Sequence, residues 1–175
     1  PVIADDTIGS GININALPHA DLVFSSLTKS FAGRGDVLAG SLVLSHHSRW
    51  RDQFAASASA LKPLAQLAGD DAIALDQGSE DVDERVQRLN ANTLFLAERL
   101  RHHPAVANLF HPVECENFRV LQRPGGGHGC LLSFELKGEP LTAQRVYDAL
   151  QVCKGPSLGT AFTLVCPYVL LAHYE

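Results

Sequence analysis

The sequence lacks methionine altogether and has one tryptophan and three tyrosines among its 175 residues. It also lacks any apolar run of the roughly 18 to 20 residues that a membrane-spanning helix needs, and no basic-then-apolar leader opens the chain. We therefore expect neither export nor a membrane partner, and the expected location is the cytoplasm. Because the chain begins at Pro1 and closes on an apolar stretch without a cap, we expect a piece of a longer protein.

Cysteine pairs and basic clusters are also missing. The cysteines lie far apart without CxxC spacing, which argues against a disulfide scaffold and predicts reduced, partly buried thiols at Cys115, Cys130, Cys153 and Cys166. The 14 Lys and Arg residues form no basic stripe and the formal net charge is −5, which argues against a nucleic-acid partner. With 46% hydrophobic and 19% charged residues, the composition is that of a soluble globular protein, and small molecules remain as the expected partners.

Strand and helix patterns alternate along the chain, which predicts an α/β fold. Strand patterns lie at 2–4, 22–24, 37–44, 106–110 and 130–136, and the first reads as a buried strand. Helix patterns lie at 46–68 with a break near Pro63, at 79–102 and at 141–150, while the type of 163–172 stays open. Ser79 is the predicted N-cap of the long helix 79–102. We expect this helix to link two lobes, with a boundary near residue 103.

The densest cluster of reactive side chains is the segment 25–30 (SSLTKS), which follows an apolar strand. Hydroxyl and backbone N–H groups in such a turn donate hydrogen bonds to a phosphate, and a lysine adds positive charge. The amine of Lys29 can also form a Schiff base with an aldehyde cofactor, provided that the site holds it partly desolvated. A surface turn with a solvated lysine explains these six residues equally well.

Asp5 lies 24 positions before Lys29, at the end of the first predicted strand. A pyridoxal ring withdraws electrons only while its ring nitrogen stays protonated, and a buried carboxylate beside that nitrogen keeps it so. Neighbouring strand ends would bring Asp5 and Lys29 to one ring. Taken alone, Asp5 and Asp6 read more simply as a turn signal.

Four segments together resemble the signature of the pyridoxal-phosphate enzymes of cysteine and methionine metabolism: 4–7 (ADDT), 20–23 (ADLV), 26–29 (SLTK) and 33–40 (GRGDVLAG). The family's pattern runs Asp-Asn-Thr, then Ser-x-Thr-Lys, then Gly-Gly-His-x-Asp-Val-x-Gly. The resemblance continues through Arg85, Asn90 and Ala91 and through 157–159 (SLG), and it spans nearly the whole chain. The chain departs from the pattern at Asp6, Arg34 and Phe162, where the family has asparagine, histidine and glutamate.

The resemblance implies a role for individual residues. Lys29 would form the Schiff base with pyridoxal 5'-phosphate and would be the catalytic residue. The other implied contacts are the pyridinium nitrogen for Asp5, the ring for Thr7, the phosphate for Ser26 and Thr28, and the substrate carboxylate for Ser157. No metal is implied.

The resemblance also implies a fold and an activity. The fold is that of a fold type I pyridoxal-phosphate-dependent transferase, with the C-terminal part of the large domain at 1–103 and an incomplete small α/β domain at 104–175. The sequences of segments 123–127 and 154–160 are most similar to those of fungal cystathionine γ-synthases. This similarity implies γ-replacement on an O-acylhomoserine with cysteine to give cystathionine. The intact protein would take an amino-acid substrate and form a homo-oligomer, a dimer or a tetramer.

Several alternatives stay open. Cystathionine lyases and homoserine sulfhydrylases share the core cofactor residues, so the reaction is not fixed by them. The family's upstream half and its closing Arg-x-Ser motif are absent, so this chain alone is expected to be inactive. A non-catalytic fragment or degenerate paralogue is a third possibility.

Three other motifs are weaker. Ser26 to Lys29 also satisfies the Ser-x-x-Lys pattern of serine β-lactamases and penicillin-binding proteins, but no Ser-Asp-Asn or Lys-Thr-Gly follows. The pairs His46-His47 and His102-His103 lack partners at metal-ligand spacing. The glycine run 125–127 lacks the Lys-Ser/Thr of a nucleotide loop, so a turn before a strand is the preferred interpretation.

Overall fold

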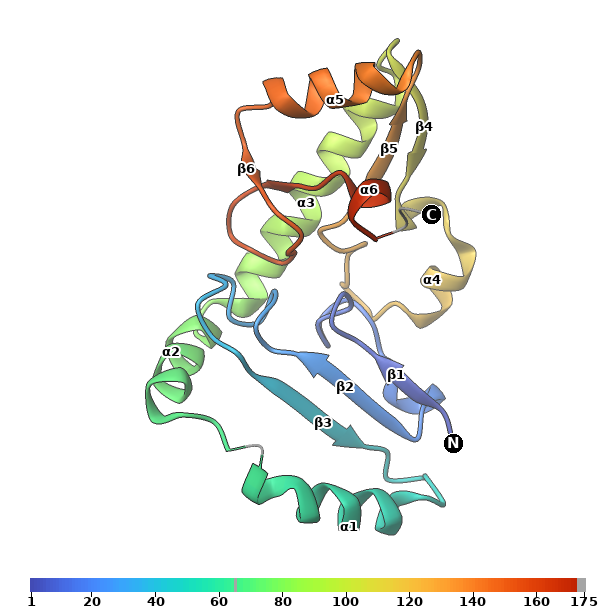
Figure 1. Ribbon diagram of the computed structural model, residues 1–175. Helices are drawn as coiled ribbons and strands as arrows, with labels where there is room; N and C mark the ends of the chain where they lie inside the picture. Colours follow the sequence, from blue (N-terminus) through green and yellow to red (C-terminus); the bar gives the residue numbers. More distant parts are fainter. Residues whose placement is uncertain (65, 173–175) are drawn as a thin grey trace.

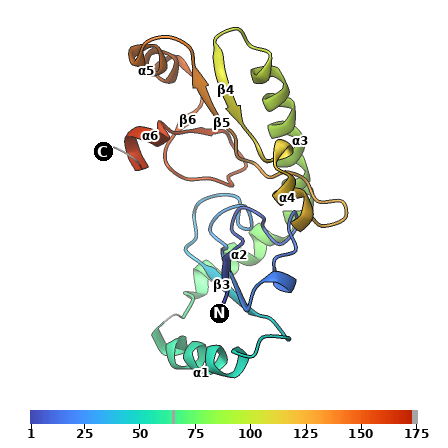
Figure 2. The same ribbon diagram turned by 90° about the vertical axis from the view of Figure 1, so that its right-hand side faces the viewer.

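The computed structural model describes residues 1–64 and 66–172. Figure 1 shows helix α3 (Val82–Arg101) running from a three-stranded sheet to a second group of elements around strands β4 and β5. In the turned view, α1 lies at the end of the molecule away from that second group (Figure 2). The fold is mixed α/β, as predicted, while the domain division at residue 103 stays a prediction.

The sheet consists of β1 (Ile3–Asp5), β2 (Leu22–Ser26) and β3 (Gly40–Leu44), in that order. Strands β1 and β2 are parallel, with Asp5 opposite Phe24, and β3 runs antiparallel to β2. Because carboxyl ends of parallel strands meet at one edge, the residues after β1 and after β2 come together. The predicted strand 37–44 begins only at Gly40, and the Ala39 N–H before it donates to the Thr28 hydroxyl instead of to a strand partner.

The helices differ from the prediction at their ends. Helix α3 begins at Val82, with Asp81 in the N-cap position, so the prediction of Ser79 as N-cap is wrong. Ser79 instead ends an unpredicted helix, α2 (Gly69–Ser79), and its hydroxyl donates to the Asp76 carbonyl at 2.7 Å. Helix α1 covers Arg51–Leu61, followed by a 3-10 turn at Lys62–Leu64, so it is shorter than the predicted 46–68.

The late start of α1 has a local cause. The Ser48 hydroxyl donates to the Asp21 carboxylate at 2.7 Å and accepts from the Trp50 N–H at 3.0 Å. These bonds hold the segment before Arg51 as a turn against Asp21, the residue before β2, instead of a helix.

The second group contains β4 (Val106–Phe110) paired antiparallel with β5 (Ser133–Leu136), and helix α5 (Pro140–Ala149) follows. The β4 and α5 predictions are confirmed, whereas the strand predicted at 130–136 begins only at Ser133. Short elements not anticipated from the sequence are α4 (Glu116–Leu121), β6 (Cys153–Lys154) and 3-10 turns at Leu17–His19 and Pro112–Glu114. The undecided segment 163–172 holds β7 (Leu164–Val165) and α6 (Tyr168–Ala172).

Two buried asparagines join the sheet side to the second group. Asn13 and Asn90 are 1% and 8% exposed, and each side-chain amide donates to the other's oxygen, at 3.1 and 2.8 Å. The same oxygens accept from the Gly127 and Gly129 N–H groups, both at 2.9 Å. A buried amide pair satisfied in this way fixes one arrangement of the N-terminal loop, α3 and the glycine-rich turn.

Apolar burial around the sheet is sparse in this chain. Leu22 and Val23 of β2 are buried, but Ile3 of β1 is 53% exposed and Leu42 of β3 is 57% exposed. The expectation that the first strand is buried is therefore wrong for this chain, because none of its described helices covers β1. No helix among the described residues is long and apolar enough to cross a membrane. All four cysteines are free thiols, with Cys130 and Cys166 partly buried and Cys115 and Cys153 exposed.

Candidate cofactor site

The ends of β1 and β2 are linked by side-chain hydrogen bonds. The Asp5 carboxylate accepts from the Thr7 N–H at 2.9 Å, and the Thr7 hydroxyl accepts from the Ser26 N–H at 2.9 Å. The parallel register of the two strands makes this possible, since it places Asp5 beside Phe24 and brings Ser26 within reach of Thr7. The structure therefore brings together three of the predicted site residues at the carboxyl edge of the sheet.

Lys29 lies in the tight turn that follows β2. The Ala32 N–H donates to the Leu27 carbonyl at 2.9 Å, and the Gly33 N–H donates to the Lys29 carbonyl at 2.8 Å. The chain leaves the turn through Gly33, whose φ of +75° lies in the left-handed region that favours glycine. Lys29 itself is half-buried, and the turn gives it a fixed backbone.

Thr28 is held on the other side of this turn. Its hydroxyl accepts from the Ala39 N–H at 3.1 Å and makes a longer contact, at 3.4 Å, as donor to the Ala39 carbonyl. A phosphate contact would require the hydroxyl proton to turn away from that carbonyl, which is an inexpensive change for so long a bond.

The most informative contact joins two residues 128 positions apart: the Lys29 amine donates to the Ser157 hydroxyl at 3.2 Å. The segment that carries Ser157 packs directly on the lysine turn. The Ala161 N–H donates to the Gly33 carbonyl at 2.8 Å, and Gly159 has a φ of +74°. A Cβ at Gly159 would lie against the Ser30 nitrogen and 2.9 Å from the Lys29 carbonyl carbon, so only glycine permits this approach.

Arg85 is a site neighbour to which sequence reasoning gave no role. Its side chain is buried on α3, and its guanidinium donates to the carbonyl oxygens of Ser30 and Phe31, which directly follow Lys29. Its position next to Val86, on the face of α3 that also carries Asn90 and Ala97, was the available signal, because a charged residue is almost never buried without partners.

Asp6, the residue that replaces the family's asparagine, lies beside the site. Its side chain is buried, and one carboxylate oxygen accepts from the Gly11 N–H at 2.9 Å. Burial raises the pKa of the Asp6 carboxyl, an effect that the Gly11 hydrogen bond and the positive charge of Arg123 partly offset.

These residues fit the chemistry of pyridoxal phosphate. An aldehyde takes a primary amine, a protonated pyridine nitrogen takes a carboxylate, and a phosphate takes hydroxyl and N–H donors. The Lys29 amine, the Asp5 carboxylate and the Ser26 and Thr28 hydroxyls supply these groups on two neighbouring strand ends. Among the described residues no group of three His, Cys, Asp or Glu side chains is positioned to hold a metal ion.

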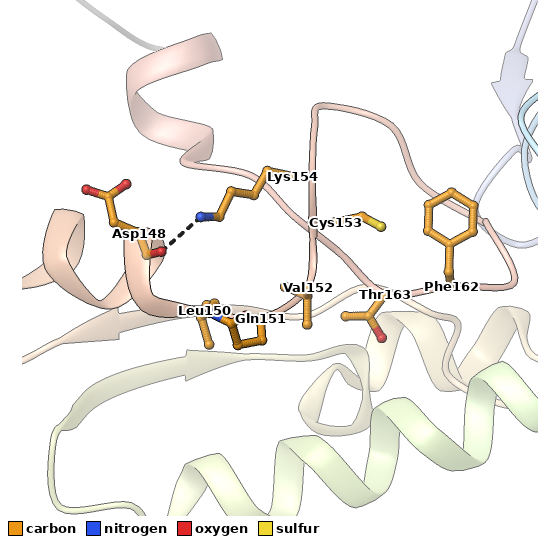
Figure 3. A pocket seen from close by; sticks show the side chains of 8 residues that line it. All are labelled: Asp148, Leu150, Gln151, Val152, Cys153, Lys154, Phe162 and Thr163. Atoms are coloured by element: carbon orange, nitrogen blue, oxygen red, sulfur yellow. Dashed lines mark hydrogen bonds between the residues drawn. The ribbon is translucent and has the colours of Figure 1, made fainter.

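A surface hollow of about 530 Å³ lies elsewhere, between the end of α5, β6 and the segment before β7 (Figure 3). Its lining includes Cys153, Lys154 and Phe162 and none of the predicted site residues. The Lys154 amine donates to the Asp148 carbonyl at 3.0 Å and lies over the Tyr147 ring. Both contacts engage this amine with neighbouring groups of the protein, so we assign no chemistry to the hollow.

Sequence and structure comparisons agree with one another. The chain is 40% identical to the cystathionine gamma-synthase of Neurospora crassa and 36% identical to that of Saccharomyces cerevisiae, and each match covers 99% of the chain. The chain spans only 28% and 29% of the length of these relatives.

Two solved structures superpose on almost the whole chain. A gamma-lyase from Micromonospora echinospora matches with a TM-score of 0.83 at 30% identity, covering 98% of this chain and 45% of that one. A cystathionine gamma synthase from Xanthomonas oryzae pv. oryzae, solved with aminoacrylate and cysteine, matches with a TM-score of 0.84 at 27% identity, covering 98% and 44%. The sequence model for the Cys/Met metabolism PLP-dependent enzymes matches residues 1–174. The chain therefore belongs to the family of pyridoxal-phosphate-dependent enzymes of cysteine and methionine metabolism.

Proposed function

We propose that the intact protein joins cysteine to an O-acylhomoserine and releases cystathionine and the acyl group. The observation that carries this proposal is the hydrogen bond from the Lys29 amine to the Ser157 hydroxyl. It brings the proposed cofactor lysine and the proposed substrate-carboxylate residue to one place. The names of the Neurospora and yeast relatives support the same reaction.

The proposed cofactor contacts use the carboxyl edge of the sheet. Bound pyridoxal phosphate supplies an electron sink for charge that develops at the substrate carbons. When the cofactor is bound, Asp5 would keep the ring nitrogen protonated, and Thr7, which ties Asp5 to Ser26, would contact the ring. Ser26 and Thr28 would hold the phosphate.

Lys29 would have a second task whenever its amine is not attached to the cofactor. Its freed amine takes the proton from Cα of the substrate and moves a proton at Cβ, which is the work of a positioned general base and acid. Ser157 stands 3.2 Å from this amine and binds the substrate carboxylate, so it holds Cα near Lys29. The Cγ–O bond then breaks and the acyl group leaves as a carboxylate. The cysteine thiol forms the new Cγ–S bond, and its proton is released together with the carboxylate, while Lys29 returns protons to Cβ and Cα.

The test is an assay of the full-length protein with O-acylhomoserine plus cysteine, O-acylhomoserine plus sulfide, and cystathionine alone. We expect cystathionine from the first mixture as the fastest reaction. Faster formation of homocysteine from sulfide would identify a sulfhydrylase, and faster breakdown of cystathionine would identify a lyase, which the likeness to the solved gamma-lyase favours as the second candidate. No turnover in any mixture would contradict a catalytic role.

The remaining expectations stay predictions of the intact protein. These are a homo-oligomer of two or four subunits, a cytoplasmic location, and no nucleic-acid partner. Light scattering of the full-length protein would settle the subunit number.

A further inference from the structure

Arg85 is the most deeply buried charge around the site. It stands in the first turn of α3 with 5% of its surface exposed. Its Nη2 donates to the carbonyls of Phe31 and Gly78, both at 2.6 Å, and to that of Ser30 at 3.3 Å. Its Nε also contacts the Ser30 carbonyl at 3.4 Å, and Nη1 pairs with the Asp81 carboxylate.

These partners fall into two sets with different consequences. Gly78 and Asp81 belong to the corner between α2 and α3, so their contacts fix how the two helices meet. Ser30 and Phe31 belong to the turn directly after Lys29, so their contacts fix the backbone that carries the proposed cofactor lysine. A purely structural arginine would need only the first set.

The fit around the guanidinium is close on the side of the turn. A Cβ at Gly33 would lie 2.5 Å from the Arg85 Nε, and a Cβ at Gly78 would lie 2.8 Å from the Ala32 carbonyl oxygen. Glycines at both positions let the backbone of the turn approach the planar donor fork. A lysine at 85 would offer one compact ammonium in place of that fork and would not span both carbonyls.

We propose that Arg85 is a positioning residue that holds the Ser30 and Phe31 carbonyls and thereby aims the Lys29 amine at Ser157 and at the cofactor aldehyde. The aiming of Lys29 at the cofactor rests on the proposed function. The bracing of the turn does not, because it follows from the contacts alone.

The experiment uses the full-length protein with Arg85→Lys and Arg85→Met, and Arg88→Met as the matched control. Arg88 lies on the same helix and faces the same Asp81 at 4.0 Å, but its side chain is 61% exposed. The first measurement is amide hydrogen exchange at Ala32 and Gly33 without cofactor. The second is the pH midpoint of the visible absorbance of the cofactor–lysine adduct, which reports the setting of Lys29.

We expect exchange at Ala32 and Gly33 to accelerate by on the order of tenfold or more in both Arg85 variants and not in Arg88→Met, since charge-assisted bonds to the turn are lost. The absorbance midpoint should shift in the same two variants. A lower thermal midpoint with unchanged exchange and unchanged absorbance midpoint would overturn the proposal and leave Arg85 as a helix-corner residue. If Arg85→Met does not fold, the milder Arg85→Lys decides by the same criteria.

Failure of the proposed function has a different signature. In that case the wild-type protein forms no adduct on Lys29, while exchange at Ala32 and Gly33 still responds to Arg85. If the wild-type protein forms the adduct, but exchange at Ala32 and Gly33 is the same in the Arg85 variants as in the wild type, the Arg85 proposal alone is refuted.

Discussion

The turn that carries Lys29 and the strand that carries Asp5 are held to very different degrees. The turn is contacted by Arg85 from α3, by the Gly159 segment and by Ala39. Among the described residues strand β1 pairs with β2 alone, Ile3 at its start is 53% exposed, and Asp5 itself is exposed. Contacts within this chain therefore hold the turn of Lys29, whereas they leave the Asp5 carboxylate largely uncovered.

This difference has a chemical meaning. A carboxylate controls the protonation of a neighbouring ring nitrogen most strongly where water is excluded. Around Asp5 this chain does not exclude water, and the relatives it matches contain much more chain than it does. Variants in the Lys29 turn should then alter this chain directly, whereas variants of Asp5 should act only through the cofactor.

The largest effect is expected for Lys29→Ala. Removal of the amine takes away both the attachment point and the general base, so turnover by the full-length protein should fall by about 10³-fold or more. Steady-state assays measure this, with Lys62→Ala, an exposed lysine, as the control. Retention of a tenth of the activity by Lys29→Ala would contradict the catalytic role proposed for Lys29.

Gly159→Ala tests the tight packing on the turn. The new methyl group would press on the Ser30 nitrogen in a left-handed backbone, and overpacking of this kind costs about 1–3 kcal/mol. Thermal unfolding should detect the loss. Gly155→Ala is the matched control, since its nearest neighbour would be the Leu164 side chain at an ordinary 3.8 Å. Equal stability of the two variants would mean that the turn is not held as described.

Asp5→Asn tests the other side of the comparison. Asparagine keeps an oxygen for the Thr7 N–H, and the site is exposed, so stability should change by less than about 0.5 kcal/mol. Turnover by the full-length protein should fall by about 10²-fold, because the ring loses its charged partner. A marked loss of stability, or unaltered turnover, would argue that Asp5 has a structural role instead.

The smallest effect is expected for Asp6→Asn. The pKa of the Asp6 carboxyl is raised in the folded state, so folding favours its protonated form and the protein loses stability as the pH rises from the ordinary pKa of an aspartate through this raised pKa. Asparagine stays neutral and can still accept from the Gly11 N–H. The variant should be more stable at pH 7, with a smaller gain at pH 4, in thermal scans. A gain that is the same at both pH values would show that ionisation of Asp6 is not the cause.

The sequence predicted the parts of this comparison that depend on local patterns. The strand at 22–24, the turn around Lys29 and the helix at 141–150 follow from apolar runs, small polar residues and helical spacing. The prediction of Ser79 as an N-cap failed because its hydroxyl donates to the Asp76 carbonyl in the last turn of α2, and Arg85 contacts the same corner through the Gly78 carbonyl. The bracing by Arg85 and the docking of Gly159 are contacts between distant segments, which no local pattern specifies.

The exposure of β1 is a failure of another kind. An apolar run predicts burial, but burial needs a partner, and none of the described helices of this chain covers Ile3. Residue pattern and actual burial can differ whenever the covering element lies outside the chain.

The assignment of Lys29 as the cofactor lysine is best tested by trapping. Full-length protein incubated with pyridoxal phosphate would be reduced with borohydride, digested and mapped by mass spectrometry. We expect the reduced cofactor on Lys29. Modification of Lys62, Lys137 or Lys154 in its place, or of no lysine in this chain, would contradict it.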